Sequence, residues 1–335
     1  MKAVYLKQFG GTENFELVEV ERPSLFEGGV RVQLKATAFN PVDYQIRRGG
    51  PESIRLKSRI LGREMAGVVT EIDSSVKNLQ VGDEVFSYVS NLGSSGTYTE
   101  EIVVPEVLVV RKPANLNFNQ SAAIPLVGLT AVQAVLRCPF EPMDKIFVAG
   151  GAGGVGSMIV RLLKLKGARN IFSTAGNEES RNQLLSMGLS EDQVHDYRDA
   201  QIVENLLSAA GGEMDVCFDT VGEKMSEISA DIIKIEGVYA DITFLATEAA
   251  RDNLFGKGVT ILNISNYAHA LDGVTGKLNF YRENLDFLRQ KPESDELAAT
   301  PIEVVGDLSV ETVAKAHDLL EKNLTRGKKL VMEIN

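Results

Sequence analysis

The stretch FVAGGAGGVGSMIVRLLKLKG (147–167) joins an apolar run to a helical pattern through a series of glycines and alanines. A glycine-rich turn between a strand and a helix lets the backbone approach a phosphate group closely, because no Cβ atom is in the way. The turn fits the dinucleotide-binding pattern G-x-G-x-x-G over Gly151, Ala152, Gly153, Gly154, Val155 and Gly156. The alternative is a tight turn that only packs a strand against a helix, so the surrounding sequence has to be considered.

The chain around this turn, from about residue 145 to 265, alternates short apolar runs with helical patterns. Strands are expected in KIFVAG (145–150), NIFSTAG (170–176), QVHDY (193–197), DVCFDTVG (215–222), VYADITFL (238–245) and GVTILNIS (258–265). Helices are expected between them, for example in EESRNQLLSMG (178–188) and KMSEISADIIKIEG (224–237). This alternation predicts an α/β domain with a doubly wound parallel sheet, and in that context the glycine turn favours a dinucleotide.

The residues after the second strand bear on which dinucleotide is bound. Sites that select NAD carry an acid there, about 20 residues after the glycine turn, to bind the ribose 2′-hydroxyl. The sequence IFSTAGN (171–177) contains no acid, which permits the 2′-phosphate of NADP. Thr174 and Ser180 offer hydroxyl groups to that phosphate, and Arg181 offers a positive charge. A nucleoside-triphosphate P-loop is disfavoured, because no lysine follows the last glycine of the turn.

Residues 1 to about 123 have β-strand patterns instead. VRVQLKATAFN (30–40) alternates apolar and polar residues, as a half-buried strand does. YTEEIVVPEVLVVRKP (98–113) contains two strand-like runs broken by Pro105. Several short strands at close spacing predict a small barrel or sandwich.

Helical patterns appear on both sides of the α/β region. NQSAAIPLVGLTAVQAVL (119–136) is helical, with a break or kink expected at Pro125. Near the C-terminus, ETVAKAHDLLEKN (311–323) predicts an amphipathic helix, and KKLVMEIN (328–335) predicts a final strand.

Composition and charge exclude several function classes. The 335 residues include 46 acidic and 35 basic side chains, for a net charge of −11, so nucleic acid is not an expected partner. Two cysteines, Cys138 and Cys217, cannot form a disulfide framework and suit a reducing compartment. No apolar run approaches the roughly 18 residues of a membrane span, and no signal-peptide pattern begins the sequence. A cytoplasmic protein without membrane contact is therefore expected.

The sequence differs from short-chain dehydrogenases, which use Tyr-x-x-x-Lys, since none of its eight tyrosines precedes a lysine at that spacing. A β-rich first third before a central dinucleotide region resembles the medium-chain dehydrogenase/reductase superfamily. Its zinc alcohol dehydrogenases carry a ligand cysteine where AFNPVDYQIRRG (38–49) has Asn40, and a ligand histidine where GREMAG (62–67) has Arg63. A metal site is therefore not expected.

The chain instead resembles the zinc-free quinone oxidoreductases of that superfamily, over essentially its whole length. The matching motifs are NPVDYQIRRG (40–49), GREMAGVV (62–69), VGDEVF (81–86), GTYTEE (96–101), AAIPLVGLTA (122–131), GGAGGVG (150–156), HDYRD (195–199), DTVG (219–222) and RGKKLV (326–331). The resemblance implies a Rossmann dinucleotide-binding domain at 124–265 and a GroES-like β-barrel catalytic domain from 1–123 and 266–335. It also implies a homodimer.

The resemblance also implies roles for individual residues. Further cofactor contacts would come from Thr130, Tyr197, Val221, Asp241, Ile242, Ser265 and Lys328. Alternatives stay open, since Thr130 and Asp241 could bond only to backbone, Tyr197 could pack on the sheet, and Lys328 could be solvated. On the substrate side, Asn40 and Tyr44 are the expected catalytic polar groups.

Without a metal, the implied reaction is hydride transfer from NADPH to an acceptor that is already electrophilic, namely a quinone or another conjugated carbonyl. The oxyanion formed from such an acceptor is delocalised, so the protein has to position the reactants and exclude water. An alkenal or enone double-bond reductase on the same scaffold is an alternative. An NADPH-binding sensor or structural protein without turnover is another.

Overall fold

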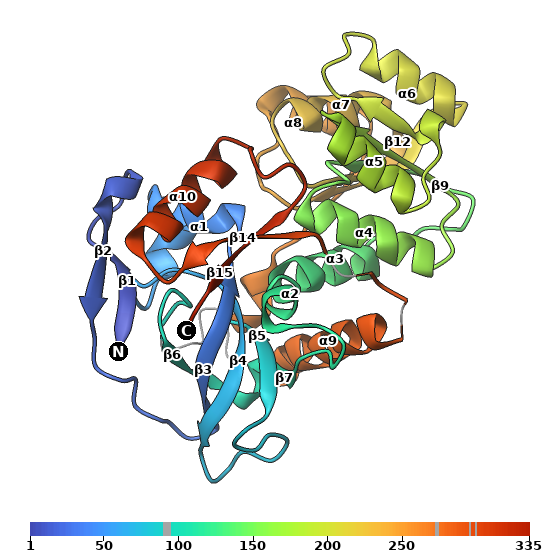
Figure 1. Ribbon diagram of the computed structural model, residues 1–335. Helices are drawn as coiled ribbons and strands as arrows, with labels where there is room; N and C mark the ends of the chain where they lie inside the picture. Colours follow the sequence, from blue (N-terminus) through green and yellow to red (C-terminus); the bar gives the residue numbers. More distant parts are fainter. Residues whose placement is uncertain (90–94, 272–274, 295, 299) are drawn as a thin grey trace. The chain divides into compact units, whose positions relative to one another are not determined.

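The computed structural model describes residues 1–89, 95–271, 275–294, 296–298 and 300–335. The chain divides into two compact units (Figure 1). The first unit contains Met1–Leu126 and Tyr267–Asn335, and the second contains Val127–Asn266. The first unit is therefore built from both ends of the chain, and the second is one continuous segment.

The first unit contains a strand pair and a seven-stranded sheet. In the pair, β1 (Lys2–Leu6) runs antiparallel to β2 (Phe15–Glu19). The order in the sheet is β14 (Ile302–Asp307), β15 (Lys329–Glu333), β3 (Gly29–Ala38), β4 (Glu64–Ile72), β5 (Glu84–Tyr88) and β7 (Val109–Arg111), and β6 (Glu101–Pro105) also pairs with β3. The C-terminal strand β15 pairs antiparallel with β3, so the tail completes a sheet that the N-terminal region begins.

Helices and 3₁₀ turns connect the strands of this unit. They are α1 (Pro41–Arg47), α2 (Phe118–Ala122), α9 (Thr275–Glu293) and α10 (Val310–Glu321), with the 3₁₀ turns η1 (Thr12–Asn14), η2 (Pro51–Arg55) and η3 (Glu106–Leu108). The break expected at Pro125 is confirmed, because α3 (Pro125–Arg137) starts at this proline. Helix α9 and strand β14 had no clear sequence pattern and were not predicted. No helix in the described ranges is long and apolar enough to cross a bilayer.

Strand β3 differs from the half-buried strand that its alternating sequence predicted. Only Gln33 is exposed, and even Arg31 is buried, with its guanidinium 2.7 Å from the carboxylate of Glu71. Strand β3 is central in the sheet, with β4 on one edge and β6 and β15 on the other, and its polar side chains bond to neighbouring segments, as when the Thr37 hydroxyl donates to the Glu64 carbonyl oxygen at 2.7 Å. Central strands are covered more completely than their own pattern indicates.

Helix α10 carries His317 into the core of the first unit. The imidazole is fully buried between the rings of Phe15, Phe39 and Tyr98, with centroid distances of 5.0, 6.1 and 5.9 Å. Its Nε2 shares a hydrogen bond of 3.1 Å with the Tyr98 hydroxyl. Burial disfavours the charged form and lowers the pKa of His317 to about 3.

The second unit contains a six-stranded, fully parallel sheet. Its order is β10 (Val194–Asp196), β9 (Asn170–Ala175), β8 (Lys145–Ala149), β11 (Met214–Asp219), β12 (Ile233–Asp241) and β13 (Thr260–Asn263). In chain order this is the 3-2-1-4-5-6 arrangement of the doubly wound dinucleotide-binding fold, so the predicted fold class is confirmed. The helices between the strands are α4 (Gly154–Leu165), α5 (Glu178–Ser186), α6 (Ile202–Ala210), α7 (Lys224–Ile232) and α8 (Glu248–Gly256), with the 3₁₀ turn η4 (Glu191–Gln193) before β10.

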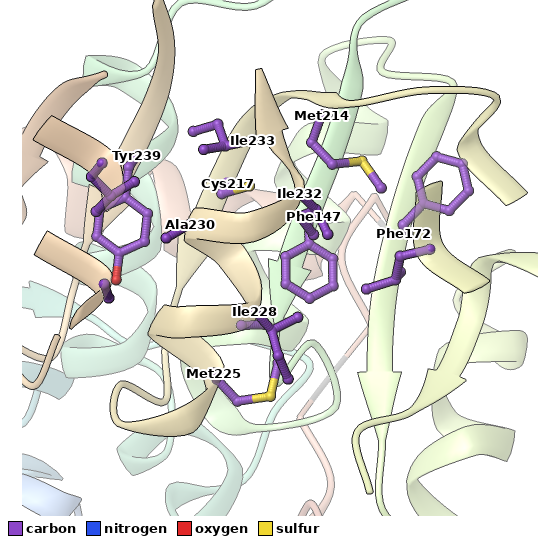
Figure 2. Close-up of a cluster of buried hydrophobic side chains, with 14 of the residues drawn as sticks. Phe147, Phe172, Met214, Cys217, Met225, Ile228, Ala230, Ile232, Ile233 and Tyr239 are labelled. Carbon is purple, nitrogen blue, oxygen red and sulfur yellow. The ribbon is translucent and has the colours of Figure 1, made fainter. Parts of the chain in front are cut away.

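The core of this unit forms where sheet residues meet α7. Phe147 of β8 and Phe172 of β9 belong to one cluster of buried side chains with Met225 and Ile228 of α7, and Figure 2 shows Phe147 beside Ile228. Burying a side chain of this size contributes about 1.5–3 kcal/mol. The helix predicted over 224–237 was too long, because Ile233 already pairs with Met214 as the first residue of β12.

His317 makes the stability of the protein depend on pH. In the unfolded chain its imidazole binds a proton near pH 6.5, whereas in the folded chain its pKa is about 3. Between these values the unfolded state holds one more proton, so this group makes the folded state less stable as the pH falls. We expect the stability difference between wild type and His317→Gln to change by about 1 kcal/mol between pH 7.5 and pH 5.5, in favour of the variant at the lower pH.

Urea unfolding at the two pH values measures this difference, because carboxylates elsewhere titrate equally in both proteins. The loss of the ring contacts destabilises the variant by the same amount at both pH values, so it cancels when the two stability differences are compared. A difference that is the same at both pH values would show that His317 is not held neutral in the fold.

Candidate functional site

The glycine turn between β8 and α4 is tightly built. Gly150 has a φ of +71°, which only glycine adopts without strain. A Cβ atom on Gly151 would lie 2.3 Å from the Ser173 hydroxyl oxygen, and one on Gly156 would lie 2.2 Å from the carbonyl oxygen of Gly150. These glycines are required by the packing of the turn itself. At Gly153 a Cβ atom would lie 3.2 Å from its nearest neighbour, so that position is more open.

The N-terminus of α4 provides donors for an anion. Gly153 is the N-cap residue, with extended backbone and no side chain to accept from the first N–H groups of the helix. Those N–H groups have no acceptor within a helix, and the helix dipole places partial positive charge there. Gly153, Gly154 and Val155 are only half buried, so these groups are accessible. The turn therefore fits the pyrophosphate of a dinucleotide.

Two further predicted residues lie against this turn. The Thr174 hydroxyl oxygen accepts a hydrogen bond of 3.3 Å from the Gly150 amide. Val221 follows β11, and a Cβ atom on Gly150 would lie 2.6 Å from its side chain. The Thr220 hydroxyl donates to the carbonyl oxygen of Ala149, at 2.7 Å, and so joins the ends of β8 and β11. These are the strands between which the chain order reverses, where doubly wound sheets bind their ligands.

Carboxylates hold the neighbouring strand ends together. Asp219 accepts from the Tyr239 hydroxyl at 2.6 Å and from the amide of Val221 at 2.9 Å. Asp241 accepts from the Phe244 amide at 2.7 Å, and burial raises the pKa of its carboxyl group. Asp241 therefore makes the loop-backbone contact that the sequence left open as its alternative role.

Ile242, Ser265 and Thr130 lie nearby in the same unit. The Ile242 amide donates to the carbonyl oxygen of Asp219, at 3.2 Å, beside the end of β12. Ser265 follows β13, and its carbonyl oxygen accepts from the side-chain amide of Gln133 at 3.2 Å. Gln133 and Thr130 both lie on α3, where Thr130 is buried.

The residues predicted to bind a 2′-phosphate differ in whether their side chains already have partners within the fold. Ser180 lies in the first turn of α5, and its amide donates to the side chain of the N-cap residue Asn177, at 2.8 Å. Arg181 donates to the carbonyl oxygen of Val194 at 2.7 Å and forms an ion pair with Glu191. Its guanidinium is thus already engaged within the fold, which sequence reasoning did not anticipate.

Tyr197 lies at the end of β10, close to the end of β9. Its ring is 42% exposed and lies against Gly176, where a Cβ atom would meet the ring at 2.4 Å. The Arg198 guanidinium lies 5.8 Å from the ring centroid and is paired with Asp196. The structure therefore places an accessible aromatic ring next to the strand end that lacks an acid.

In the first unit, Asn40 is the N-cap residue of α1. The Asp43 carboxylate accepts a hydrogen bond of 2.8 Å from the backbone N–H of Asn40, and Pro41 occupies the first helical position. Asp43 is fully buried, and desolvation raises its pKa to about 7. Tyr44 lies in the first turn of α1, half buried, and its hydroxyl makes no hydrogen bond to the part of the chain that is described.

The Asn40 side chain belongs to a buried cluster with Glu64 and Lys329. The Lys329 ammonium donates to Glu64 Oε1 at 2.7 Å, to the Phe39 carbonyl oxygen at 2.9 Å, and to Asn40 Oδ1. Asn40 Nδ2 donates to the same Glu64 oxygen at 2.8 Å. The second oxygen of Glu64 accepts from the Leu126 amide at 2.7 Å. Asn40, Glu64 and Lys329 are 1%, 0% and 5% exposed.

Sequence reasoning missed Glu64 and Lys329. It singled out Lys328, which is half buried, whereas Lys329 is the inward lysine. The available signal was position: Lys329 is the first residue of the apolar strand KLVME (329–333), in which Lys329 to Met332 are all buried.

Arg63 lies beside this cluster. Its side chain is almost buried, and its guanidinium is 3.5 Å from a carboxylate oxygen of Glu52. It also lines a cavity of about 30 Å³, which has room for water rather than for a ring-sized substrate. Across the described ranges, no three His, Cys, Asp or Glu side chains form a group able to hold a metal ion.

Comparison with known proteins agrees with this architecture. Residues 27–114 match the alcohol dehydrogenase GroES-like domain, and residues 154–275 match the family described as zinc-binding dehydrogenase. The chain is 31% identical over 342 residues to a chloroplastic NADPH-dependent alkenal/one oxidoreductase of Arabidopsis thaliana, covering all of this chain and 80% of that protein. It is 29% identical over 339 residues to quinone oxidoreductase 1 of Escherichia coli, covering 96% and 97% of the two chains.

Among solved structures, the quinone oxidoreductase from Coxiella burnetii superposes with a TM-score of 0.83 at 26% identity, covering 100% of this chain and 99% of that one. The chain that is similar to these relatives has a doubly wound sheet and the glycine turn. At the two positions where zinc alcohol dehydrogenases carry a ligand, it has Asn40 and Arg63. The protein belongs to the zinc-free quinone oxidoreductase family of the medium-chain dehydrogenase/reductase superfamily.

Proposed function

We propose that the protein is a zinc-independent reductase that uses NADPH to reduce a quinone or another conjugated carbonyl compound. The observation that carries this proposal is the buried Asn40–Glu64–Lys329 cluster. In this cluster an amide, a carboxylate and an ammonium form hydrogen bonds with one another. Asn40 stands at the position where zinc alcohol dehydrogenases carry a zinc ligand. The unit from Val127 to Asn266 would bind NADP(H) through the glycine turn.

The chemistry of the cluster fits a conjugated acceptor. When bound, NADPH supplies the hydride. An ordinary ketone needs a Lewis acid or a strong proton donor at its oxygen, because the alkoxide that forms is localised. A quinone or enone spreads this charge, so hydrogen bonds from neutral groups are sufficient. The Asn40 amide and the Tyr44 hydroxyl are such donors, and Arg63 adds positive charge nearby.

Selection of NADPH over NADH is the finer part of the proposal. It is supported by the absence of an acid at the end of β9, where Ala175 is the last residue. Thr174, Ser180 and Tyr197 lie around this strand end and would accommodate the 2′-phosphate. Arg181 would contribute only after leaving Glu191 and the Val194 carbonyl oxygen.

An alkenal or enone reductase is the second candidate function. The observation that favours it is the 31% identity over the full chain to an alkenal/one oxidoreductase. Both functions use the same groups in the same way, and they differ in the shape of the acceptor.

We also propose a homodimer in a reducing compartment such as the cytoplasm. Strand β13 is the last strand of its sheet, and Thr260, Ile261 and Asn263 in it are exposed. A second copy pairing there would cover this edge. The two cysteines, Cys138 and Cys217, are free and buried, which is consistent with a reducing environment.

The main test is oxidation of NADPH and NADH with a panel of quinones, alkenals, enones and simple ketones, with and without a chelator. We expect turnover with NADPH and conjugated acceptors, little with simple ketones, and no effect of the chelator. Absorbance at the nicotinamide band measures all of these rates. Preference for quinones or for alkenals decides between the two candidate functions, and NADPH binding without any turnover would contradict both.

The glycine turn can be tested at Gly153, where an added Cβ atom would lie 3.2 Å from the Gly150 carbonyl oxygen, so the neighbouring backbone has to shift slightly in any variant. Asp and Asn are both good N-cap residues, and Gly153 has the extended backbone of an N-cap. We expect Gly153→Asp to bind NADPH at least about tenfold more weakly than Gly153→Asn, because only the first puts a negative charge beside the pyrophosphate. Fluorescence titration measures binding, and equal melting temperatures show that the fold is retained. Equal NADPH affinity in the two variants would place the cofactor elsewhere.

Cofactor selection can be tested at the end of β9. We expect Ala175→Asp to reduce the preference for NADPH over NADH by about tenfold or more, because the new carboxylate repels a 2′-phosphate and can bond a 2′-hydroxyl. Ala175→Asn is the matched neutral control. The ratio of kcat/KM for the two cofactors is the measurement. If both variants keep the wild-type ratio, the 2′-phosphate is recognised at another position.

A further inference from the structure

The Lys329 ammonium has three N–H donors, and the structure gives each of them an oxygen acceptor. These acceptors are the Phe39 carbonyl, Asn40 Oδ1 and Glu64 Oε1. An ammonium has no further donor, so Lys329 cannot also bond a substrate. Its effect on chemistry must therefore pass through the groups that it holds.

The Asn40 carboxamide is held from both sides by opposite charges. The ammonium of Lys329 can bond only to the amide oxygen, and the carboxylate of Glu64 can bond only to the amide nitrogen. Turning the carboxamide over would place oxygen against carboxylate and N–H against ammonium, which are both repulsive. The ion pair therefore allows one orientation of the Asn40 side chain.

This orientation leaves one N–H of the Asn40 amide without a partner in the cluster. Because the cluster is buried, water cannot compensate for a wrongly oriented amide dipole. A donor that is fixed before reaction is worth most where charge develops on an acceptor oxygen. The same ammonium also holds the Phe39 carbonyl, directly before the first turn of α1, which carries Tyr44.

We propose that Lys329 is a positioning residue of the reaction: together with Glu64 it fixes the Asn40 carboxamide so that an N–H, and not the oxygen, is presented to the acceptor. This inference rests on the proposed function, since it assigns the Asn40 amide to the acceptor oxygen. It separates two roles within the cluster. Asn40 contacts the acceptor, and the ion pair sets the direction of that contact.

The first test is the double variant Glu64→Gln with Lys329→Met, which removes both charges and so leaves neither one buried and unpaired. We expect kcat to fall tenfold or more, with an acceptor KM within about threefold of wild type and unchanged NADPH affinity. The melting temperature should stay close to that of wild type. Lys315→Met, an exposed lysine on α10, is the control and should change none of these values.

A second variant covers the case in which the double variant does not fold. Lys329→Arg keeps the positive charge beside Glu64, but a planar guanidinium cannot direct three donors as an ammonium does. We expect it to fold and to lower kcat at unchanged NADPH affinity. A kcat within twofold of wild type, in whichever of these variants folds, would overturn the proposal and leave Lys329 a structural role only.

A double-mutant cycle then asks whether Lys329 acts through Asn40. Asn40→Ala is combined with the Glu64→Gln and Lys329→Met pair. We expect the pair to have little further effect on kcat once the amide is absent, because contacts in one network are not additive. Full additivity would overturn the proposal. A wild-type protein that reduces no acceptor would overturn the proposed function as well, whereas active wild type with unaffected variants would overturn this inference alone.

Discussion

The ion pair between Lys329 and Glu64 is the interaction on which the candidate acceptor site depends. It joins the last strand of the chain, β15, to the first residue of β4, and through the Phe39 carbonyl and Asn40 to the start of α1. Taking two charges out of water is costly, and a buried pair repays the cost only with good geometry and further hydrogen bonds. Here every donor of the ammonium is used, and each carboxylate oxygen accepts at least one hydrogen bond. Replacing such a pair by hydrophobic residues of similar volume is often neutral or stabilising, so the ion pair is weak evidence for a role in stability.

The sequence predicted the fold of the second unit better than that of the first. Parallel strands alternating with helices repeat one local pattern, and each repeat can be recognised by itself. In the first unit, the sheet is assembled from both ends of the chain, and polar side chains of β3 are buried against distant segments, as Thr37 is against the Glu64 carbonyl oxygen. That burial is a tertiary effect, so the alternation of residues 30–40 could not reveal it. The end of α7 was misplaced for a related reason, since only pairing with Met214 shows that Ile233 begins a strand.

The part of the candidate site that is formed by the backbone could be predicted from the sequence. The glycine turn requires small residues at fixed spacing, and this requirement is visible in the sequence and in the contacts of Gly151 and Gly156. Side-chain pairing was not predictable, because it joins residues from distant segments. Arg181 was expected to be available for a phosphate, but it is bound to Glu191 and the Val194 carbonyl oxygen. Lys328 was expected at the cofactor and stays a prediction, whereas the buried ion pair of the neighbouring Lys329 with Glu64 was not expected.

In the proposed function the two units interact with different kinds of charge, and this difference would explain why the chemistry needs no strong acid. A dinucleotide is an anion whose charge is constant, so fixed donors at a helix N-terminus suit it, and the turn before α4 provides them from backbone alone. An acceptor oxygen gains charge only during reaction. A free cation beside it would bind water or an anion before the substrate arrives, and a metal would favour a different substrate. In the proposed reaction, pairing Lys329 with Glu64 leaves a neutral amide of defined direction, Asn40, which would bind weakly to the uncharged acceptor and more strongly to the oxyanion that replaces it. That difference between ground state and transition state is what accelerates a reaction.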